Sequence, residues 1–248
     1  MTLALTLMLV GGVSVQAQEL SATATWRANR GVIETIERAY YRRDLAAAKA
    51  ASADIGDSAP SLRAWSMWRL ANMHPIHAVS RSVKRVNEAA RKQLLEDAEV
   101  LLKTHLEGSP NDALATLVLS QVYQSRITGM MSGMRFGRRA SEALERALDL
   151  DPENPHVVYH RGINQLMAPG PFGNKEEGGR RLQEAVARFG AELSRDGFNW
   201  GYGEALAFLG LSFARKGDPA RARKYYERAL TVEPGYVWVR EELLAELP

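Results

Sequence analysis

The chain has 248 residues, 46% of them hydrophobic and 25% charged, which is enough for a sizeable core in one or two domains. Its 32 basic and 29 acidic residues leave a formal net charge of +3 and are interleaved without a sustained basic stripe, which argues against a nucleic-acid partner. The lack of cysteine excludes a disulfide framework and a cysteine nucleophile, and we expect no cysteine-linked lipid anchor.

The first residues are typical of an export signal. Residues 3–10 form a short apolar run that Gly11 and Gly12 interrupt, and Val15-Gln16-Ala17 fits a cleavage site. No Lys or Arg precedes the run, and an ordinary apolar N-terminal helix is the alternative. We expect residues 1–17 to be removed after Ala17, leaving a periplasmic or secreted protein with no integral membrane segment.

A weak helical repeat follows over residues 18–110, where we expect divergent helical hairpins. Small or branched residues on a second helix are followed by a turn proline: Ala48 with Pro60, and Ala98 and Leu102 with Pro110. The segment 72–85 is expected to be an inserted loop, and it contains Met73, His74 and His77.

Three more stretches read as loops. The segment 129–137 is Gly-Met-Met-Ser-Gly-Met-Arg-Phe-Gly, and 168–174 is Ala-Pro-Gly-Pro-Phe-Gly-Asn, where Pro and Gly oppose a helix. The segment 194–201 is a further irregular stretch. Alternating strand patterns are absent from the sequence, so we predict an all-α protein of about eleven helices in four or five hairpins.

Between these loops the helix signals are clear. Ala140, Leu144 and Ala147 share one helix face, and a turn follows at Pro152. Asn154 as a cap and Pro155 at the first helical position predict a new helix from His156.

The stretch from Gly203 to Pro234 carries the most regular pattern. Residues of suitable size stand at offsets 4, 7, 8, 11, 20, 24, 27 and 32: Leu206, Leu209, Gly210, Phe213, Ala222, Tyr226, Ala229 and Pro234. The pattern resembles the tetratricopeptide repeat, a pair of antiparallel helices that stacks into a solenoid. The residues 237–247 would then form a closing helix, within a C-terminal cap over 235–248.

A second likeness covers 111–234, the region of repeats with inserted loops. The helix start with Asn154, Pro155, Arg161 and Gly162 and the loop with Gly170, Pro171, Phe172 and Gly173 are similar to exported bacterial tetratricopeptide proteins. Among these is the T component associated with periplasmic TRAP-type transporters. The resemblance implies a non-enzymatic partner of another protein.

In the repeat template, several side chains fall on or beside the concave face, where a protein or peptide partner would bind. These are His156, Tyr159, His160 and Ile163, and further along the chain Gln121, Gln124, Glu204 and Ala207. His156 and His160 are four residues apart and could share a metal ion, but the sequence near them offers no third ligand.

The alternative function is a small-molecule or Cu(I) carrier. Arg161 occupies a template position that is normally a buried leucine, so it either holds carbonyls or a carboxylate or, with Phe172, binds an anionic ligand. Met130, Met131 and Met134 could form a Cu(I) site with Met73, His74 and His77, although methionine more often fills packing gaps.

Catalytic motifs are missing from the sequence. It has no Gly-x-Ser-x-Gly motif, and its serines and histidines are not spaced to assemble a nucleophile, base and orienting acid. We therefore predict a non-enzymatic scaffold without a cofactor or resident metal, and self-association of the solenoid is a further option.

Overall fold

The computed structural model describes residues 24–74, 81–168, 170, 173–197 and 200–248, and the side chains of 81–83 and 196 lie outside that description. Within these residues every regular element is helical, which confirms the predicted all-α class. No helix in this described part is both long and apolar enough to cross a membrane. The predicted signal, residues 1–17, lies outside the described residues, as do His77 and Phe172.

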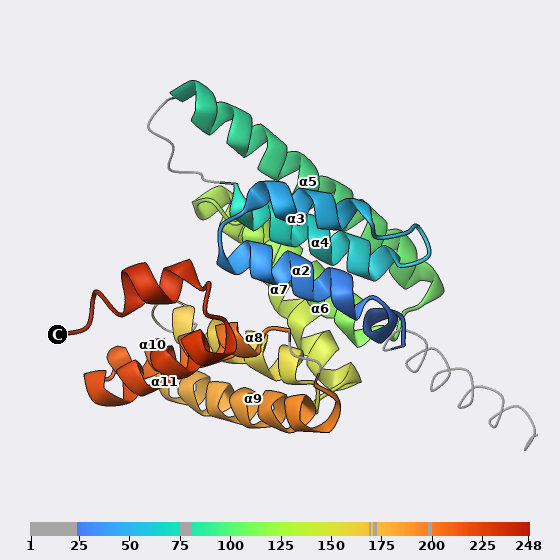
Figure 1. The fold of residues 1–248 in the computed structure, drawn as a ribbon. Helices are drawn as coiled ribbons and strands as arrows, with labels where there is room; N and C mark the ends of the chain where they lie inside the picture. The colour runs from blue at the N-terminus through green and yellow to red at the C-terminus, as the bar shows by residue number, and fades with distance from the viewer. Residues whose placement is uncertain (1–23, 75–80, 169, 171–172, 198–199) are drawn as a thin grey trace, which may run out of the picture. The chain divides into compact units, whose positions relative to one another are not determined.

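The helices follow one another with short connections (Figure 1). They are α2 (Arg30–Tyr41), α3 (Leu45–Ala53), α4 (Pro60–Met73), α5 (Arg81–Gly108), α6 (Ala113–Ser125), α7 (Met130–Leu150), α8 (Pro155–Met167), α9 (Lys175–Asp196), α10 (Tyr202–Ala214), α11 (Pro219–Val232) and the short π-helix η2 (Val239–Leu243).

The chain divides into two compact units. The first comprises Met1–Arg30 and Ser52–Leu150, and the second comprises Gly31–Ala51 and Asp151–Pro248. The expected boundaries at 110, 111 and 234 differ from this division and stay a prediction about domains.

The first unit is built on two helical pairs, α4 with α5 and α6 with α7, and α6 also packs on α4 and α5. Pro60 starts α4 at a position where its missing N–H costs nothing. Asp112 caps α6 by accepting a hydrogen bond from the backbone N–H of Ala115 at 2.8 Å. At the other end of this unit, Trp26 packs edge-on against Trp65 and donates to the Ser61 hydroxyl at 3.3 Å.

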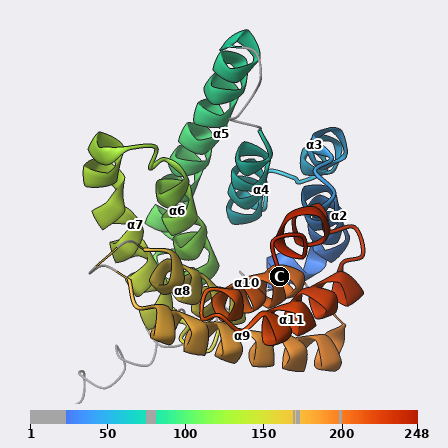
Figure 2. The ribbon, with the colours of Figure 1, turned by 90° about the vertical axis from the view of Figure 1, so that its left-hand side faces the viewer.

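The second unit repeats this arrangement with α8 paired to α9 and α10 paired to α11, while α10 also packs on α8 and α9 (Figure 2). The expected cap at Asn154 is confirmed, because its side chain accepts from the N–H of His156 at 3.0 Å. Adjacent antiparallel pairs of this kind are the architecture of a tetratricopeptide-like solenoid.

The packing expected for 203–234 is also confirmed. Leu206, Leu209, Phe213, Ala222, Tyr226 and Ala229 are buried, and so is Gly210. A Cβ at Gly210 would lie 2.6 Å from Cδ1 of Tyr226 and 3.1 Å from the carbonyl oxygen of Ala222. Only glycine lets these two helices approach so closely.

The prediction of a loop at 129–137 is wrong, because α7 already begins at Met130. The Ser132 hydroxyl accepts from the backbone N–H groups of Thr128 and Gly129 and so caps the first turn. Phe136 is buried and stacks on Tyr123 with 6.2 Å between ring centroids. This anchoring outweighs the roughly 1 kcal/mol that each helical glycine costs.

The boundaries of the other expected loops differ less from those in the structure. The helix α9 continues through 194–196 and ends at Gly197, whose φ of 68° is the left-handed conformation that glycine favours. The insertion expected over 72–85 is shorter, since α4 ends at Met73 and α5 begins at Arg81. The Pro/Gly stretch does separate α8 from α9, as predicted. The closing helix expected over 237–247 is shorter, because residues 237–238 are α-helical and the π-helix η2 continues over Val239–Leu243.

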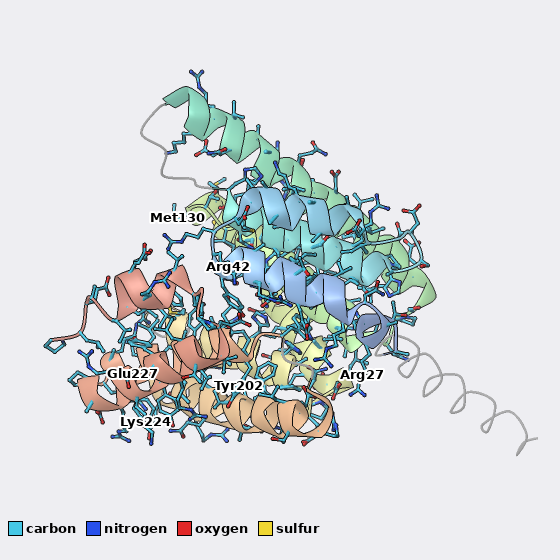
Figure 3. All side chains as sticks on the ribbon, in the orientation of Figure 1. Arg27, Arg42, Met130, Tyr202, Lys224 and Glu227 are labelled. Atoms are coloured by element: carbon cyan, nitrogen blue, oxygen red, sulfur yellow. The ribbon has the colours of Figure 1, made fainter. Side chains whose placement is uncertain are left out.

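Within the second unit, the end of α2 packs against the segment that follows α11. Tyr41 and Tyr236 lie with ring centroids 4.4 Å apart. The side chain of Arg42 lies against Gly235, where a Cβ would meet its Nε at 2.7 Å, and Arg43 forms an ion pair with Glu242. An N-terminal helix thus closes the C-terminal repeat, and Figure 3 labels Arg42 at this contact.

Candidate functional site

The helices α8 and α10 are the first helices of consecutive hairpins, and they place corresponding residues on one face. His160 of α8 and Phe208 of α10 stand at the sixth template position, and Ile163 and Leu211 stand at the ninth. All four side chains are half-buried, so they are supported from below and still reachable from outside.

Aromatic contacts continue this face toward the C-terminus. The ring of Tyr159 lies 4.7 Å from His160 and 6.1 Å from Phe208, and Phe208 lies 5.2 Å from the half-buried Trp238. We call these five half-buried residues the aromatic surface: His160, Ile163, Phe208, Leu211 and Trp238. Such apolar and aromatic side chains are the usual energetic centre of a protein interface.

The other concave-face residues expected in this unit lie beneath that surface. His156 is only 6% exposed, because its ring stacks on Trp200 at 3.5 Å and meets the edge of Phe189 at 4.8 Å. Tyr159 is 2% exposed, and Glu204 and Ala207 are buried as well. In this structure they support the surface rather than present a contact area, and their role with a partner stays a prediction.

The two glutamines expected at the same template face belong to the first unit. Gln121 is half-buried and Gln124 is exposed, both on α6. They therefore belong to a different unit from the aromatic surface, and their assignment to the partner-binding face stays a prediction.

Arg161 is half-buried on α8, less enclosed than the leucine that normally occupies its template position. Its partner in the ligand-binding hypothesis, Phe172, lies outside the described residues. The anionic-ligand hypothesis therefore keeps its status as a prediction.

The three methionines proposed for copper are strongly exposed. Met130, Met131 and Met134 are 81%, 78% and 76% exposed at the start of α7. Among the described residues no group of three His, Asp or Glu side chains could hold a metal ion. His74 is buried at the end of α4, and a copper site stays a prediction.

One carboxyl in this unit has a clearly perturbed pKa. Burial at the end of α11 raises the pKa of Glu233 to about 7, the nearby Glu37 adds to the rise, and Arg38 and Arg42 oppose it. Glu37 accepts a hydrogen bond from the Tyr41 hydroxyl at 2.8 Å. This acidic pair therefore lies where α2 closes the C-terminal repeat.

Sequence reasoning missed Phe208, Leu211 and Trp238. The first two could have been found, because they repeat the template positions of His160 and Ile163 one hairpin later. Trp238 lies beyond the repeat, and only its contact with Phe208 reveals it.

Comparison with known proteins bears on the fold of this unit. A family model of the tetratricopeptide repeat matches residues 203–236, which comprise α10, α11 and the turn that follows. No curated protein matches the chain. The hairpin that supplies Phe208 and Leu211 of the aromatic surface thus matches the tetratricopeptide repeat, whereas the likeness to the T component of TRAP-type transporters stays a prediction.

Proposed function

We propose that this protein is an exported, non-enzymatic tetratricopeptide scaffold that binds a protein or peptide partner through the aromatic surface. The observation that carries the proposal is the correspondence between α8 and α10. Two consecutive first helices present half-buried residues at the same two template positions, next to Trp238. Three of these four residues are apolar, and the fourth is His160.

The chemistry of the surface defines the partner segment it would accept. Ile163, Leu211 and Phe208 offer apolar area, and the imidazole of His160 offers a hydrogen-bonding group at its edge. Rigid helices hold these side chains, so little ordering is needed when a partner binds. A segment with one or two large apolar side chains flanked by polar groups fits this description.

The test uses the full chain, tagged at its C-terminus, expressed in its own host and recovered from a periplasmic extract. We expect a partner to copurify with the parent and to be lost from a His160→Ala/Leu211→Ser double variant. The matched control is Val86→Ser/Met167→Ser, which removes two exposed apolar residues, one on α5 and one at the end of α8, that lie outside the aromatic surface. Equal recovery of the partner by the two double variants would reject this surface.

Two further measurements test the cleaved signal and the alternative function separately. Mass spectrometry of the recovered chain should show the N-terminus at Gln18, and retention of residues 1–17 would reject a cleaved signal. A small-molecule or Cu(I) carrier would instead show a retained ligand mass under native conditions, lost in Arg161→Ala or Met134→Ala.

A further inference from the structure

The first two turns of α7 carry three methionines that face away from the core of the first unit. Met130, Met131 and Met134 are the most exposed large apolar side chains among the described residues. Figure 3 labels Met130. Met130 and Met134 are one turn apart and share a face, and Met131 stands beside them. A soluble protein seldom exposes such a cluster without a contact to make.

Arginines accompany these methionines along the helix. Arg135 follows Met131 by one turn and Arg139 follows Arg135 by another, so the three form one stripe. Arg138 is paired with Glu142 at 3.0 Å, but neither Arg135 nor Arg139 forms an ion pair within the described part of the chain. Two exposed guanidinium groups therefore lie next to apolar side chains.

A pocket of about 220 Å³ opens beside this stripe, between α5, α6 and α7. Val100, which is 66% exposed, and the ring of Phe136 give it apolar lining, and Lys103, Arg135 and Arg139 give it positive charge. The pocket thus repeats the combination of apolar and cationic groups found on the stripe.

The carboxylates of the pocket are already engaged. Arg126 forms ion pairs with both Glu96 and Glu99, and Lys103 donates to Glu99 at 2.6 Å. The guanidinium of Arg126 also lies over the ring of Phe136, 4.4 Å from its centroid. Because this network uses its own acids internally, Arg135 and Arg139 are the cations left for an external anion.

We propose that this face of the first unit binds an acidic amphipathic segment of a protein partner. The binding face, the methionine–arginine surface, consists of Val100, Met130, Met131, Met134, Arg135 and Arg139. Carboxylates of the segment pair with Arg135 and Arg139, in the bidentate geometry that guanidinium favours. Its apolar side chains lie on the methionines, whose flexible thioethers adapt to many shapes.

The pocket favours a peptide over an anionic membrane as the occupant. A recess can receive a side chain, whereas a bilayer surface cannot follow it. The recess belongs to the first unit and the aromatic surface to the second, and the inference does not depend on the proposed function.

The test measures binding of a fluorescent 18-residue helical peptide made of Leu, Glu and Gln, with its leucines on one face. A peptide of the same composition with leucines spread around the helix is the reference. We expect the full chain to bind the amphipathic peptide at least tenfold more tightly than the reference, and added salt to weaken this binding.

Two variants locate the site. Arg135→Glu/Arg139→Glu and Met130→Ser/Met131→Ser/Met134→Ser should each weaken binding of the amphipathic peptide at least tenfold. The matched control is Arg223→Glu/Lys224→Glu on α11, which makes the same change in charge at exposed positions and should bind like the parent. Circular dichroism checks that all three variants keep parental helicity.

Three outcomes would overturn the inference. The first is equal affinity for the two peptides, and the second is an equal loss of binding in the α11 control. The third is methionine-dependent binding to phosphatidylglycerol vesicles without peptide binding, which would assign the surface to a membrane. Sedimentation of the chain alone gives a further check, because self-association abolished by the methionine variant would assign the surface to a second copy.

Discussion

The two units share one order of helix contacts but hold their hairpins together differently. In the second unit glycines bring helices into close contact: a Cβ at Gly178 would lie 2.7 Å from the backbone nitrogen of Leu166. In the first unit a Cβ at any of the described glycines would meet nothing closer than 3.8 Å, and at Gly137 it would meet nothing within 4 Å.

Polar side chains take over this role in the first unit. The Ser120 hydroxyl donates to the carbonyl of Ala140 at 2.8 Å, and the Trp68 indole donates to Ser125 at 3.0 Å. The difference teaches that one arrangement of helices can be maintained by two kinds of contact.

We expect the largest change in stability from glycine substitutions, which test whether close helix contacts distinguish the two units. Gly178→Ala should destabilise the protein by about 2–4 kcal/mol, because the new methyl group meets the backbone of α8 and cannot be relieved by a rotamer change. Gly137→Ala in α7 should instead stabilise by about 0.5–1 kcal/mol, since alanine is the better helix former. Urea denaturation of both variants measures this contrast, and equal effects would remove the distinction between the units.

The polar network of the first unit gives the next largest effect. Arg126→Met should cost about 2–3 kcal/mol, because it leaves the buried carboxylate of Glu99 without its guanidinium partner. Arg138→Met, which breaks an exposed pair with Glu142, should change stability by less than about 0.5 kcal/mol. Thermal denaturation of the two variants tests this, and a second change, Glu99→Gln, should recover part of the loss in Arg126→Met.

The helix caps allow a matched comparison between units. Asn154→Ala should cost about 1 kcal/mol through the lost hydrogen bond to the His156 N–H. Asn154 also donates from Nδ2 to Asp151, but it is less buried than Asp112. Asp112→Ala should therefore cost more, about 1–2 kcal/mol, because its loss leaves buried or half-buried groups, the Nε2 of His105 among them, without their partner. A smaller loss for Asp112→Ala than for Asn154→Ala, measured by urea denaturation, would contradict this ranking.

The smallest expected effect is a pH dependence in the second unit. The pKa of Glu233 is raised to about 7 from its ordinary 4.5, so the folded chain holds this proton more tightly than the unfolded chain. Its contribution is therefore present below about pH 4.5 and is lost as the pH rises toward 7. We expect about 1 kcal/mol after solvent screening. The difference between parent and Glu233→Gln, followed by urea denaturation from pH 4.5 to 7.5, should show it, and a constant difference would refute it.

Much of the fold could be read from the sequence where packing demands a particular side-chain size. Gly210, Ala222 and Tyr226 reveal a hairpin because their offsets and volumes must agree. The glycines and methionines of segment 129–137 give it the composition of a loop, and its helix was missed although Ser132 caps it locally. The burial of Phe136 depends on Tyr123 of the preceding helix, which a local pattern does not show.

The candidate site was read only in part. His160 and Ile163 were found from template positions, yet the same template also selected His156, which Trp200 covers. A repeat pattern predicts the direction in which a side chain leaves its helix. It does not predict whether a residue of another segment covers that side chain.

By itself, the sequence determined the all-α class, the hairpin at 203–234 and the cap of α8 at Asn154, because helix period, residue volume and capping are local properties of the chain. Only the tertiary structure decided which concave-face residues stay accessible and that the end of α2 packs on the segment after α11. It also decided that Arg135 and Arg139 lie beside exposed methionines without an acidic partner in the described residues. The exposure of a side chain and its ion pairs depend on contacts between segments far apart in the sequence, so a local sequence pattern does not predict them.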